Sequence, residues 1–361
     1  MKTTKKLSFF LLAALTAPMF TSCESTDKVV DVPEISTGVY VLNQGKSKSN
    51  NASLTYYNLA SGSTTADVFA AANNRGLGDT GQDIIKYGSR LYIAVYKSSL
   101  VEVVSAQTGV SIKSIPMLTS TTPAMPRSLA AANGKVYVTL YDGHVTELDT
   151  VSLATGRTVA VGSNPEQSVI VNNKLYVANS GGMAVKNDST ISVINLDNFT
   201  VGTPIKVVIN PTVIKADKYG DLYVISMGNY YDIPYTLQRI NTTTNVVTKI
   251  TDVKAYNMTI DGDNAYIYHF EYNANWEIIN KSYSVYDVKN EKLITSNFIP
   301  SDALKQVPFS IDVNPVTKDV YIGETDYINT GKMYCYGADG KLKFSFATGV
   351  NPTKTIFITN K

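Results

Sequence analysis

The sequence predicts an all-β protein, a seven-bladed β-propeller with four-stranded blades. The first observation is a unit at residues 82–115, where four short apolar runs alternate with turn signals, as in strands joined by hairpins. The second observation is that this unit recurs along the chain with a Tyr in its second strand. We expect these tyrosines to be core residues of equivalent strands: Tyr92, Tyr137, Tyr176, Tyr223, Tyr266 and Tyr321.

The third observation concerns the two ends of the predicted ring. Residues 38–69 supply only three strands, the last of them at residues 65–69, whereas six complete units begin near residues 82, 128, 167, 212, 257 and 310. One further run, residues 353–359, follows the sixth unit. If this run lies innermost in the three-stranded first blade, the ring closes with seven blades and leaves no open sheet edge.

The N-terminus has the pattern of an export signal. Lys2, Lys5 and Lys6 precede an apolar run at residues 7–20. That run has about 14 residues, fewer than the roughly 20 that a membrane-spanning helix needs. We therefore expect a signal peptide at residues 1–22, a tether at residues 23–37 and the propeller at residues 38–361.

The chain has two cysteines, Cys23 and Cys335, which cannot form a disulfide framework if one is modified and the other buried. Cys23 stands at the expected cleavage point and resembles the lipid-modified cysteine of bacterial lipoproteins; the alternative is an ordinary signal peptide with a chance cysteine. Glu24 and Asp27 resemble the acidic export tag of surface lipoproteins. The expected location is the outer membrane, lipid-anchored and exposed at the cell surface.

Charge argues against nucleic acid as a partner. The chain has 32 basic and 30 acidic residues, and loss of Lys2, Lys5 and Lys6 with the signal reduces 32 to 29. A near-neutral surface lacks the basic stripe that phosphate binding requires.

Candidate binding residues lie on the loops that a propeller gathers on one face, namely the connections from second to third strands and from blade to blade. Residues 227–235 and 269–276 combine aromatic rings with amides, which suits a large, partly apolar ligand that carries amide or hydroxyl groups. The alternative is that such loops are rich in Tyr and Asn without binding anything. The predicted ligand-binding residues are Asn43, Gln44, Arg75, Asp79, Tyr96, Arg127, Tyr141, Gln167, Asn179, Tyr230, Tyr231, Tyr272, Trp276 and Tyr327.

The sequence predicts no catalytic residues, no metal ligands and no catalytic cofactor. Its two histidines, His144 and His269, have neither a local nucleophile motif nor metal-ligand spacing. A lone His is usually an ordinary hydrogen-bonded residue, although His269 could coordinate a bound metal centre. A hydrolytic, lactonase-like propeller is the enzymatic alternative, and it would need metal ions in the central channel.

Several motifs together resemble a known family. They are residues 38–45 (GVYVLNQG), residues 50–54 (NNASL), and Leu77, Gly78 and Asp79 shortly before Gln82 and Asp83, in addition to the lipoprotein-like start. With these motifs the chain resembles the YncE-like seven-bladed propeller lipoproteins of Bacteroidetes-type bacteria, including the members called BtuG.

This resemblance implies a surface lipoprotein that captures cobalamin and passes it to the TonB-dependent transporter BtuB. The expected partners are thus a corrinoid, a BtuB-like transporter and the membrane, through the lipid anchor at Cys23. The alternative is a cell-surface scaffold that binds a protein or glycan partner, because a propeller fold does not fix function.

Overall fold

The computed structural model describes residues 33–182 and 187–360. The chain divides into a short segment, residues 1–33, and one compact unit, residues 34–361, which contains every strand described below. The predicted signal peptide and Cys23 lie outside the described residues. In the part that is described, no helix is long and apolar enough to cross a membrane.

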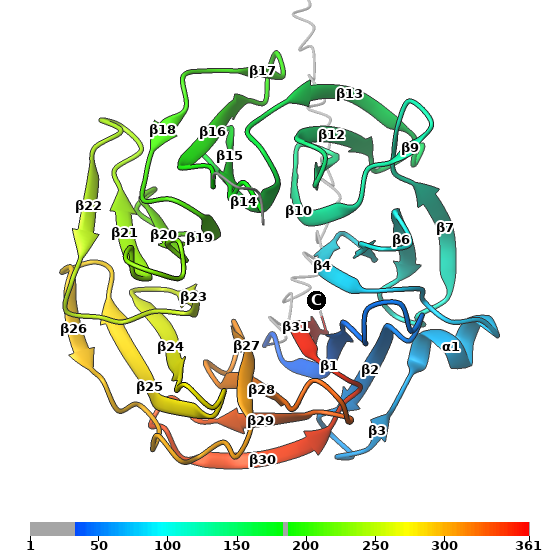
Figure 1. Ribbon diagram of the computed structural model, residues 1–361. Coiled ribbons are helices and arrows are strands. Elements are labelled where there is room, and N and C mark those ends of the chain that lie inside the picture. The colour runs from blue at the N-terminus through cyan, green and yellow to red at the C-terminus, as the bar shows by residue number, and fades with distance from the viewer. Residues whose placement is uncertain (1–32, 183–186, 361) are drawn as a thin grey trace, which may run out of the picture. The chain divides into compact units, whose positions relative to one another are not determined.

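Seven antiparallel sheets surround a central channel in residues 34–361, which confirms the predicted propeller (Figure 1). We number the blades in chain order and give strands from the innermost outward. Blade 1 consists of β31 (Pro352–Thr359), β1 (Ser36–Asn43), β2 (Ser53–Asn58) and β3 (Thr64–Thr65), and blade 2 of β4 (Gly81–Tyr87), β5 (Arg90–Val95), β6 (Leu100–Ser105) and β7 (Ser111–Pro116). Blade 3 consists of β10 (Pro126–Ala132), β11 (Lys135–Leu140), β12 (His144–Asp149) and β13 (Thr155–Ala160). Blade 4 consists of β14 (Pro165–Val171), β15 (Lys174–Asn179) and β16 (Thr190–Asn195), with β17 (Thr200–Val201) and β18 (Ile205–Lys206) both paired to β16.

The other three blades repeat the four-stranded pattern. They are β19 (Pro211–Ala216), β20 (Leu222–Ser226), β21 (Thr236–Ile240) and β22 (Val247–Ile250); β23 (Asn257–Asp261), β24 (Asn264–Tyr272), β25 (Ile278–Asp287) and β26 (Lys292–Thr295); and β27 (Val307–Val313), β28 (Val320–Thr325), β29 (Lys332–Tyr336) and β30 (Leu342–Ala347). A small hairpin, β8 (Leu118–Thr119) and β9 (Thr122–Pro123), lies between blades 2 and 3 in the sequence.

The C-terminal strand closes the ring as predicted. β31 pairs antiparallel with β1 through Val39 opposite Phe357 and Val41 opposite Thr355, and it is the innermost strand of blade 1. Figure 1 shows β31 between β1 and the channel. Strands from opposite ends of the chain thus share one sheet, so the closed ring has no open edge at this joint.

One predicted strand, residues 65–69, is wrong in most of its length. β3 ends at Thr65, and the chain then forms the helix α1 (Val68–Asn73) on the outer rim. The Asp67 side chain accepts a hydrogen bond from the Ala70 N–H and caps the helix, and Asn74 ends it in the left-handed conformation. An alanine-rich run between these two caps favours a helix over a strand.

The core lies between neighbouring blades. The six predicted tyrosines of the second strands are all buried, with exposed fractions between 0% and 6%. Tyr92 of blade 2, for example, belongs to one apolar cluster with Leu129 and Val136 of blade 3. Each sheet therefore buries its apolar side chains against the next sheet around the ring.

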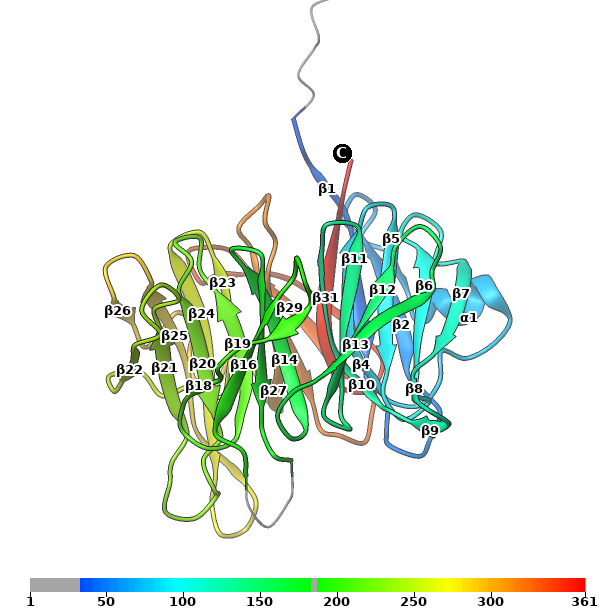
Figure 2. The same ribbon diagram turned by 90° about the horizontal axis from the view of Figure 1, so that it is seen from above.

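The two faces of the ring carry different features (Figure 2). β1 begins and β31 ends on one face, at Ser36 and Thr359, which lie opposite each other in the register. The other face carries the connections between second and third strands and the blade-to-blade connections, and we call it the mouth face. The long β20–β21 and β24–β25 connections project from it.

Candidate functional site

β-Bulges direct side chains into the mouth of the channel. Six of the seven inner strands have a register shift near the end that meets the mouth face, and β23 is the exception in the described pairings. A bulge leaves a residue out of the ladder and re-aims its side chain. The residues at these shifts are Gln82, Arg127, Glu166, Gln167, Thr212, Phe309 and Thr353, and all of them line the channel cavity.

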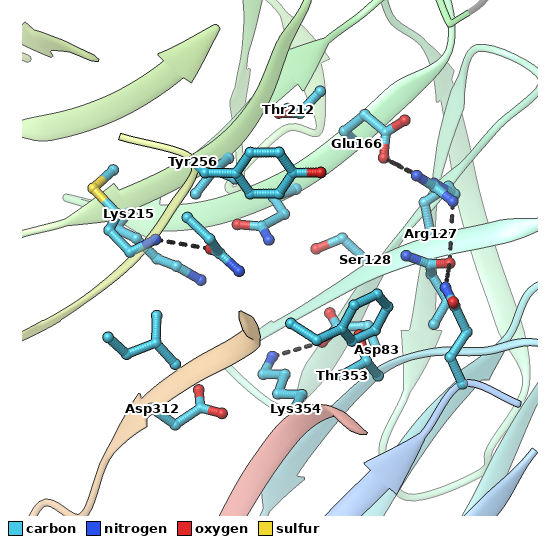
Figure 3. A pocket seen from close by; sticks show the side chains of 18 of the residues that line it. Asp83, Arg127, Ser128, Glu166, Thr212, Lys215, Tyr256, Asp312, Thr353 and Lys354 are labelled. Carbon is cyan, nitrogen blue, oxygen red and sulfur yellow. Dashed lines mark hydrogen bonds and ion pairs between the residues drawn. The ribbon is translucent and has the colours of Figure 1, made fainter. Parts of the chain in front are cut away.

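The channel cavity measures about 320 Å³ and is polar (Figure 3). Its lining includes Gln82, Ser128, Gln167, Thr212 and Asn257, which supply amide and hydroxyl groups from five inner strands. Such groups both donate and accept hydrogen bonds. The mouth therefore suits a ligand with several neutral polar substituents.

Arg127 organises one side of the mouth. Its guanidinium forms an ion pair with Glu166 on the next blade, through Nη2 and through an Nε–Oε2 hydrogen bond of 2.9 Å. Its Nη1 donates to the Gln82 Oε1 at 3.1 Å, and that oxygen also accepts from the Gln44 Nε2 at 3.4 Å. Burial raises the pKa of Glu166, and Arg127 opposes that shift. The result is a polar chain across four blades, from Gln44 to Glu166.

Two predicted tyrosines flank the same guanidinium. The Arg127 Cζ lies 5.0 Å from the ring centre of Tyr96 and 5.2 Å from that of Tyr141, and the two rings meet edge to face with centres 5.6 Å apart. Cation–π contacts of this kind stabilise by about 0.5–2 kcal/mol. The two rings and the cation are thus held in fixed positions beside the channel mouth.

A larger aromatic cleft of about 680 Å³ opens between blades 5 and 6. Its rings form a continuous series with centre-to-centre distances of 6.2 Å for Tyr230–Tyr235, 5.7 Å for Tyr235–Tyr256 and 4.3 Å for Tyr256–Phe270. The series continues to Tyr272 and Trp276 at 5.5 and 5.9 Å. Burial raises the pKa of Tyr235 to about 12, so its phenol stays neutral and can donate a hydrogen bond.

One wall of the cleft carries a charged cluster. Glu271 accepts from the Lys254 Nζ at 2.7 Å, from the Asn280 Nδ2 at 2.6 Å and contacts the His269 Nε2 at 3.1 Å. These donors, with Lys254 foremost, lower the pKa of Glu271 to about 2. Burial lowers the pKa of His269, against the effect of Glu271, so the imidazole favours its neutral form. The wall therefore presents a fixed carboxylate and a neutral imidazole.

Three aromatic residues of the face have an unusual backbone. Tyr230, Trp276 and Tyr327 have φ values of 60°, 63° and 65°, which are rare for bulky side chains. Side-chain oxygens hold the turns: Asn229 accepts from the Tyr231 N–H, Asn273 from the Glu277 N–H, and Thr325 from the Tyr327 N–H. Such strain costs on the order of 1–3 kcal/mol and concentrates at functional sites.

The cleft and the channel mouth are continuous. Tyr256 lines both cavities, and the Tyr272 hydroxyl lies 3.4 Å from that of Tyr327, which also lines the channel. A third hollow of about 480 Å³ shares Gln44, Arg127 and Tyr327 with the channel. The mouth face thus joins an aromatic half to a polar half.

Ten of the predicted binding residues lie on this continuous surface or contact the groups that line it. They are Gln44, Tyr96, Arg127, Tyr141, Gln167, Tyr230, Tyr231, Tyr272, Trp276 and Tyr327. His269 also lines the cleft. It lies in β24, because β24 and β25 extend well past the neighbouring strands and leave only residues 273–277 as the loop that we expected to begin at residue 269.

The structure corrects the predicted roles of Asn43 and Asn179. Both side chains are fully buried at the ends of β1 and β15. The Asn43 Nδ2 donates to the Thr55 Oγ1, and the Asn179 Nδ2 donates to the Ser192 Oγ, each at 2.9 Å on the neighbouring third strand. They stabilise their own blades and do not reach the surface of the site.

Arg75 and Asp79 are also placed apart from the site. The Arg75 Nη2 donates at 2.7 Å to the buried Glu102, and its guanidinium lies over the Phe69 ring, so it holds α1 and its loop against blade 2. Asp79 accepts from its neighbour Thr80 and, like Arg75, does not line any of the three hollows. A local ion pair and a turn use these two side chains, and the roles predicted for them stay predictions.

Sequence reasoning missed most of the bulge residues and the inner half of the cleft. A repeated signal was present, because five of the inner strands carry Pro directly before the bulged position, at Pro126, Pro165, Pro211, Pro308 and Pro352. Pro lacks an N–H and is common at strand starts and bulges. Tyr235, Tyr256 and Phe270 had no comparable signal, because only the fold brings them together.

Most of the chain matches one protein family. Residues 37–349 match the model of a family described as "Domain of unknown function (DUF5074)". The chain belongs to this family. No curated protein sequence matches this DUF5074 chain.

Three solved structures resemble this DUF5074 chain in fold. A quinonprotein alcohol dehydrogenase-like protein of Bacteroides thetaiotaomicron has a TM-score of 0.61 at 16% identity, over 90% of this chain and 79% of the other. A hydrazine synthase of Kuenenia stuttgartiensis has 0.60 at 16%, over 74% and 85%. A dihydro-heme d1 dehydrogenase, NirN, has 0.55 at 13%, over 88% and 68%. At sequence identities this low, the similarity shows a shared fold and nothing about function.

Proposed function

We propose that this DUF5074 protein is a non-enzymatic outer-membrane surface lipoprotein that captures corrinoids such as cobalamin (vitamin B12) and passes them to a TonB-dependent transporter. The observation that carries the proposal is the joined surface of aromatic cleft and polar mouth. Ligand pockets measure about 300–1,000 Å³ and combine apolar walls with a few fixed polar groups. The cleft alone measures about 680 Å³.

The chemistry of the two halves matches a corrin ring with amide side chains. The series from Tyr230 to Trp276 offers flat apolar area at low cost in side-chain entropy. At the mouth, the Gln82 and Gln167 side-chain oxygens accept hydrogen bonds within the protein, and their NH₂ groups can donate to the carboxamide oxygens of such a ligand. Binding on this surface needs no catalytic group, and none is assigned.

The point where the chain enters the propeller is compatible with capture at a membrane surface. The chain enters the propeller at Ser36, on the face opposite the mouth face. Lipidation of Cys23 would attach the chain to the membrane upstream of this entry point. The stretch of about 13 residues from Cys23 to Ser36 can extend to roughly 45 Å, which would allow the propeller to turn toward a transporter in the same membrane.

The alternative, a scaffold that binds a protein or glycan, has one observation in its favour. Tyr231 and Trp276 at the tips of the cleft are 94% and 81% exposed. Large exposed aromatics are typical of sites that bind macromolecules as well as small ligands.

A calorimetric titration with cyanocobalamin tests the proposal. We expect one binding site on the wild-type protein, and we expect the double variant Tyr230→Ala/Trp276→Ala to bind roughly 30-fold more weakly, because aromatic anchors dominate such sites. Tyr219→Ala is the matched control: Tyr219 is 50% exposed and lies on the opposite face, in the β19–β20 connection.

Equal affinities of the wild type and the double variant would contradict the assignment of the face. A wild-type protein that binds no cyanocobalamin at micromolar concentrations, but is isolated together with an outer-membrane complex, would contradict corrinoid capture and favour the scaffold.

A further inference from the structure

Deep in the channel, beyond the mouth, four charged side chains meet (Figure 3). Asp83, Lys215, Asp312 and Lys354 come from β4, β19, β27 and β31, and all four line the channel cavity. Lys354 and Asp312 also line a hollow of about 350 Å³ on the other side, so the cluster lies between the two hollows. It is separate from the aromatic cleft, whose lining contains none of the four.

Two of the four groups satisfy each other. The Lys354 Nζ lies 2.6 Å from the Asp83 Oδ1, and the Asp83 Oδ2 accepts from the Leu129 N–H at 2.7 Å. Both carboxylate oxygens of Asp83 are therefore used. This pair fixes the wall of the channel, and the Asp83 Oδ1 also accepts from the Ile84 N–H at 2.9 Å.

The other two groups have unused capacity. In the part of the chain that the structure describes, Lys215 forms no hydrogen bond and no ion pair, and Asp312 accepts only from the Thr355 N–H, at 2.8 Å to Oδ2. Burial, followed by the nearby Lys354, lowers the pKa of Lys215, and burial raises that of Asp312. Nearer the mouth, the Thr212 hydroxyl is buried and has no partner among the described residues.

The ligand group that best matches Lys215 and Asp312 is a neutral group that both accepts and donates hydrogen bonds. The formal charges of the two lysines and two aspartates cancel, so a ligand with a net charge would leave an uncompensated charge inside the channel. A carboxamide can accept from the Lys215 ammonium through its oxygen and donate to the free Asp312 oxygen through its NH₂ group. A carboxylate ligand would be repelled by the like charge of Asp312, and a protonated amine would be repelled by the like charge of Lys215.

We propose that the inner channel is a subsite for a carboxamide group, held between the Lys215 Nζ and the Asp312 Oδ1. The inference deepens the proposed function and rests on it for the natural ligand, because one amide arm of a corrinoid lying over the mouth is the group that would enter. The chemistry of the subsite can be tested with a small amide alone.

The test measures the acylation rate of individual lysines of the purified protein by acetic anhydride at pH 8, read by peptide mass spectrometry. Propionamide at about ten times its dissociation constant slows Lys215 about tenfold, because only the unoccupied fraction reacts. Propionate and propylamine at the same concentration leave the Lys215 rate unchanged. Lys86, an exposed lysine that lines the hollow on the other side, is the internal control and keeps its rate throughout.

The variant Asp312→Asn tests the acceptor. Its carbonyl can still accept from the Thr355 N–H, but its NH₂ group cannot accept from an amide, so propionamide loses its protection of Lys215. An unprotected Lys215 in the wild-type protein, or equal protection by propionate, would overturn the proposal without any variant.

A parallel reaction with cyanocobalamin separates this inference from the proposed function. Protection of Lys215 supports both. Calorimetric binding without protection of Lys215 overturns the assignment of the subsite to a corrinoid arm and leaves corrinoid capture intact. Protection by propionamide without any cyanocobalamin binding contradicts the proposed function and supports the subsite.

Discussion

Arg127 is the residue on which the polar side of the mouth depends. Its guanidinium contacts Glu166 of blade 4, Gln82 of blade 2 and the faces of Tyr96 and Tyr141. The Arg127 and Glu166 side chains are only 20% and 13% exposed. Removing one partner of such a pair leaves the other charge without compensation, whereas removing both does not.

Arg127→Met is therefore expected to lower the free energy of unfolding by about 3 kcal/mol. The double variant Arg127→Met/Glu166→Met should lose much less, since no charge is left behind. Urea denaturation of the wild type, both single variants and the double variant measures the coupling. Additive losses in the double variant would show that the pair is not coupled.

Glu271 gives the cleft a dependence on pH. Its pKa is lowered to about 2 by Lys254, Asn280 and His269, so the ionised form stabilises the folded state. That contribution is fully present above the pKa of an unfolded Glu, about 4.3, and is lost as the pH falls toward 2.

The melting temperature of Glu271→Gln should accordingly lie below that of the wild type at pH 6, and the difference should shrink between pH 4.5 and pH 2.5. The carboxylate is partly exposed, so the difference at pH 6 will be modest. A difference that stays constant over this range would show that ionisation of Glu271 does not stabilise the fold.

At the scale of elements, the long β24–β25 hairpin supplies the outer wall of the cleft. Trp276 at its tip is 81% exposed and has a φ of 63°, so its side chain adds little packing while its backbone is strained. A ligand contact would account for a Trp at a position that favours Gly.

Trp276→Gly should consequently keep or slightly raise the thermal stability while weakening cyanocobalamin binding about tenfold, because the ring is lost and the backbone strain is relieved. Differential scanning fluorimetry and calorimetry on the same preparations measure both quantities. A clear loss of stability with unchanged affinity would make Trp276 a structural residue.

The elements differ in how far their sequence predicts them. The strands and blade closure follow from alternation and turn residues, because a sheet buried between two neighbours imposes its pattern locally. α1 was missed because its signal is short, an alanine-rich run between the caps Asp67 and Asn74. Asn43 and Asn179 were misassigned because a sequence does not reveal that their amides are used by hydroxyls on the next strand.

At the scale of the whole molecule, closure of the ring by β31 contributes both to the stability of the fold and to the structure of the channel. β31 completes blade 1, and its Lys354 pairs with Asp83 of blade 2 across the joint. Without this strand, the inner edge of β1 would be open and the charged cluster of the channel would lose a member. The ends of the chain thus contribute to the same structure that forms the channel.

A chain that ends at Asn351 should lose cooperative thermal unfolding, since removal of β31 exposes the apolar residues that β31 covers on blades 1, 2 and 7. A chain that ends at Asn360 is the control and should unfold as the wild type does. Calorimetry distinguishes the two. An unchanged, sharp transition in the shorter chain would show that the other strands close the ring by themselves.

The most direct test of the account is a crystal structure of the protein with cyanocobalamin. We predict the macrocycle over the mouth face, with one side against Tyr230, Tyr235 and Tyr256 and an amide arm directed toward Lys215. A corrinoid bound at the opposite face or on the outer rim, or crystals with an empty mouth face at saturating cyanocobalamin, would contradict the account.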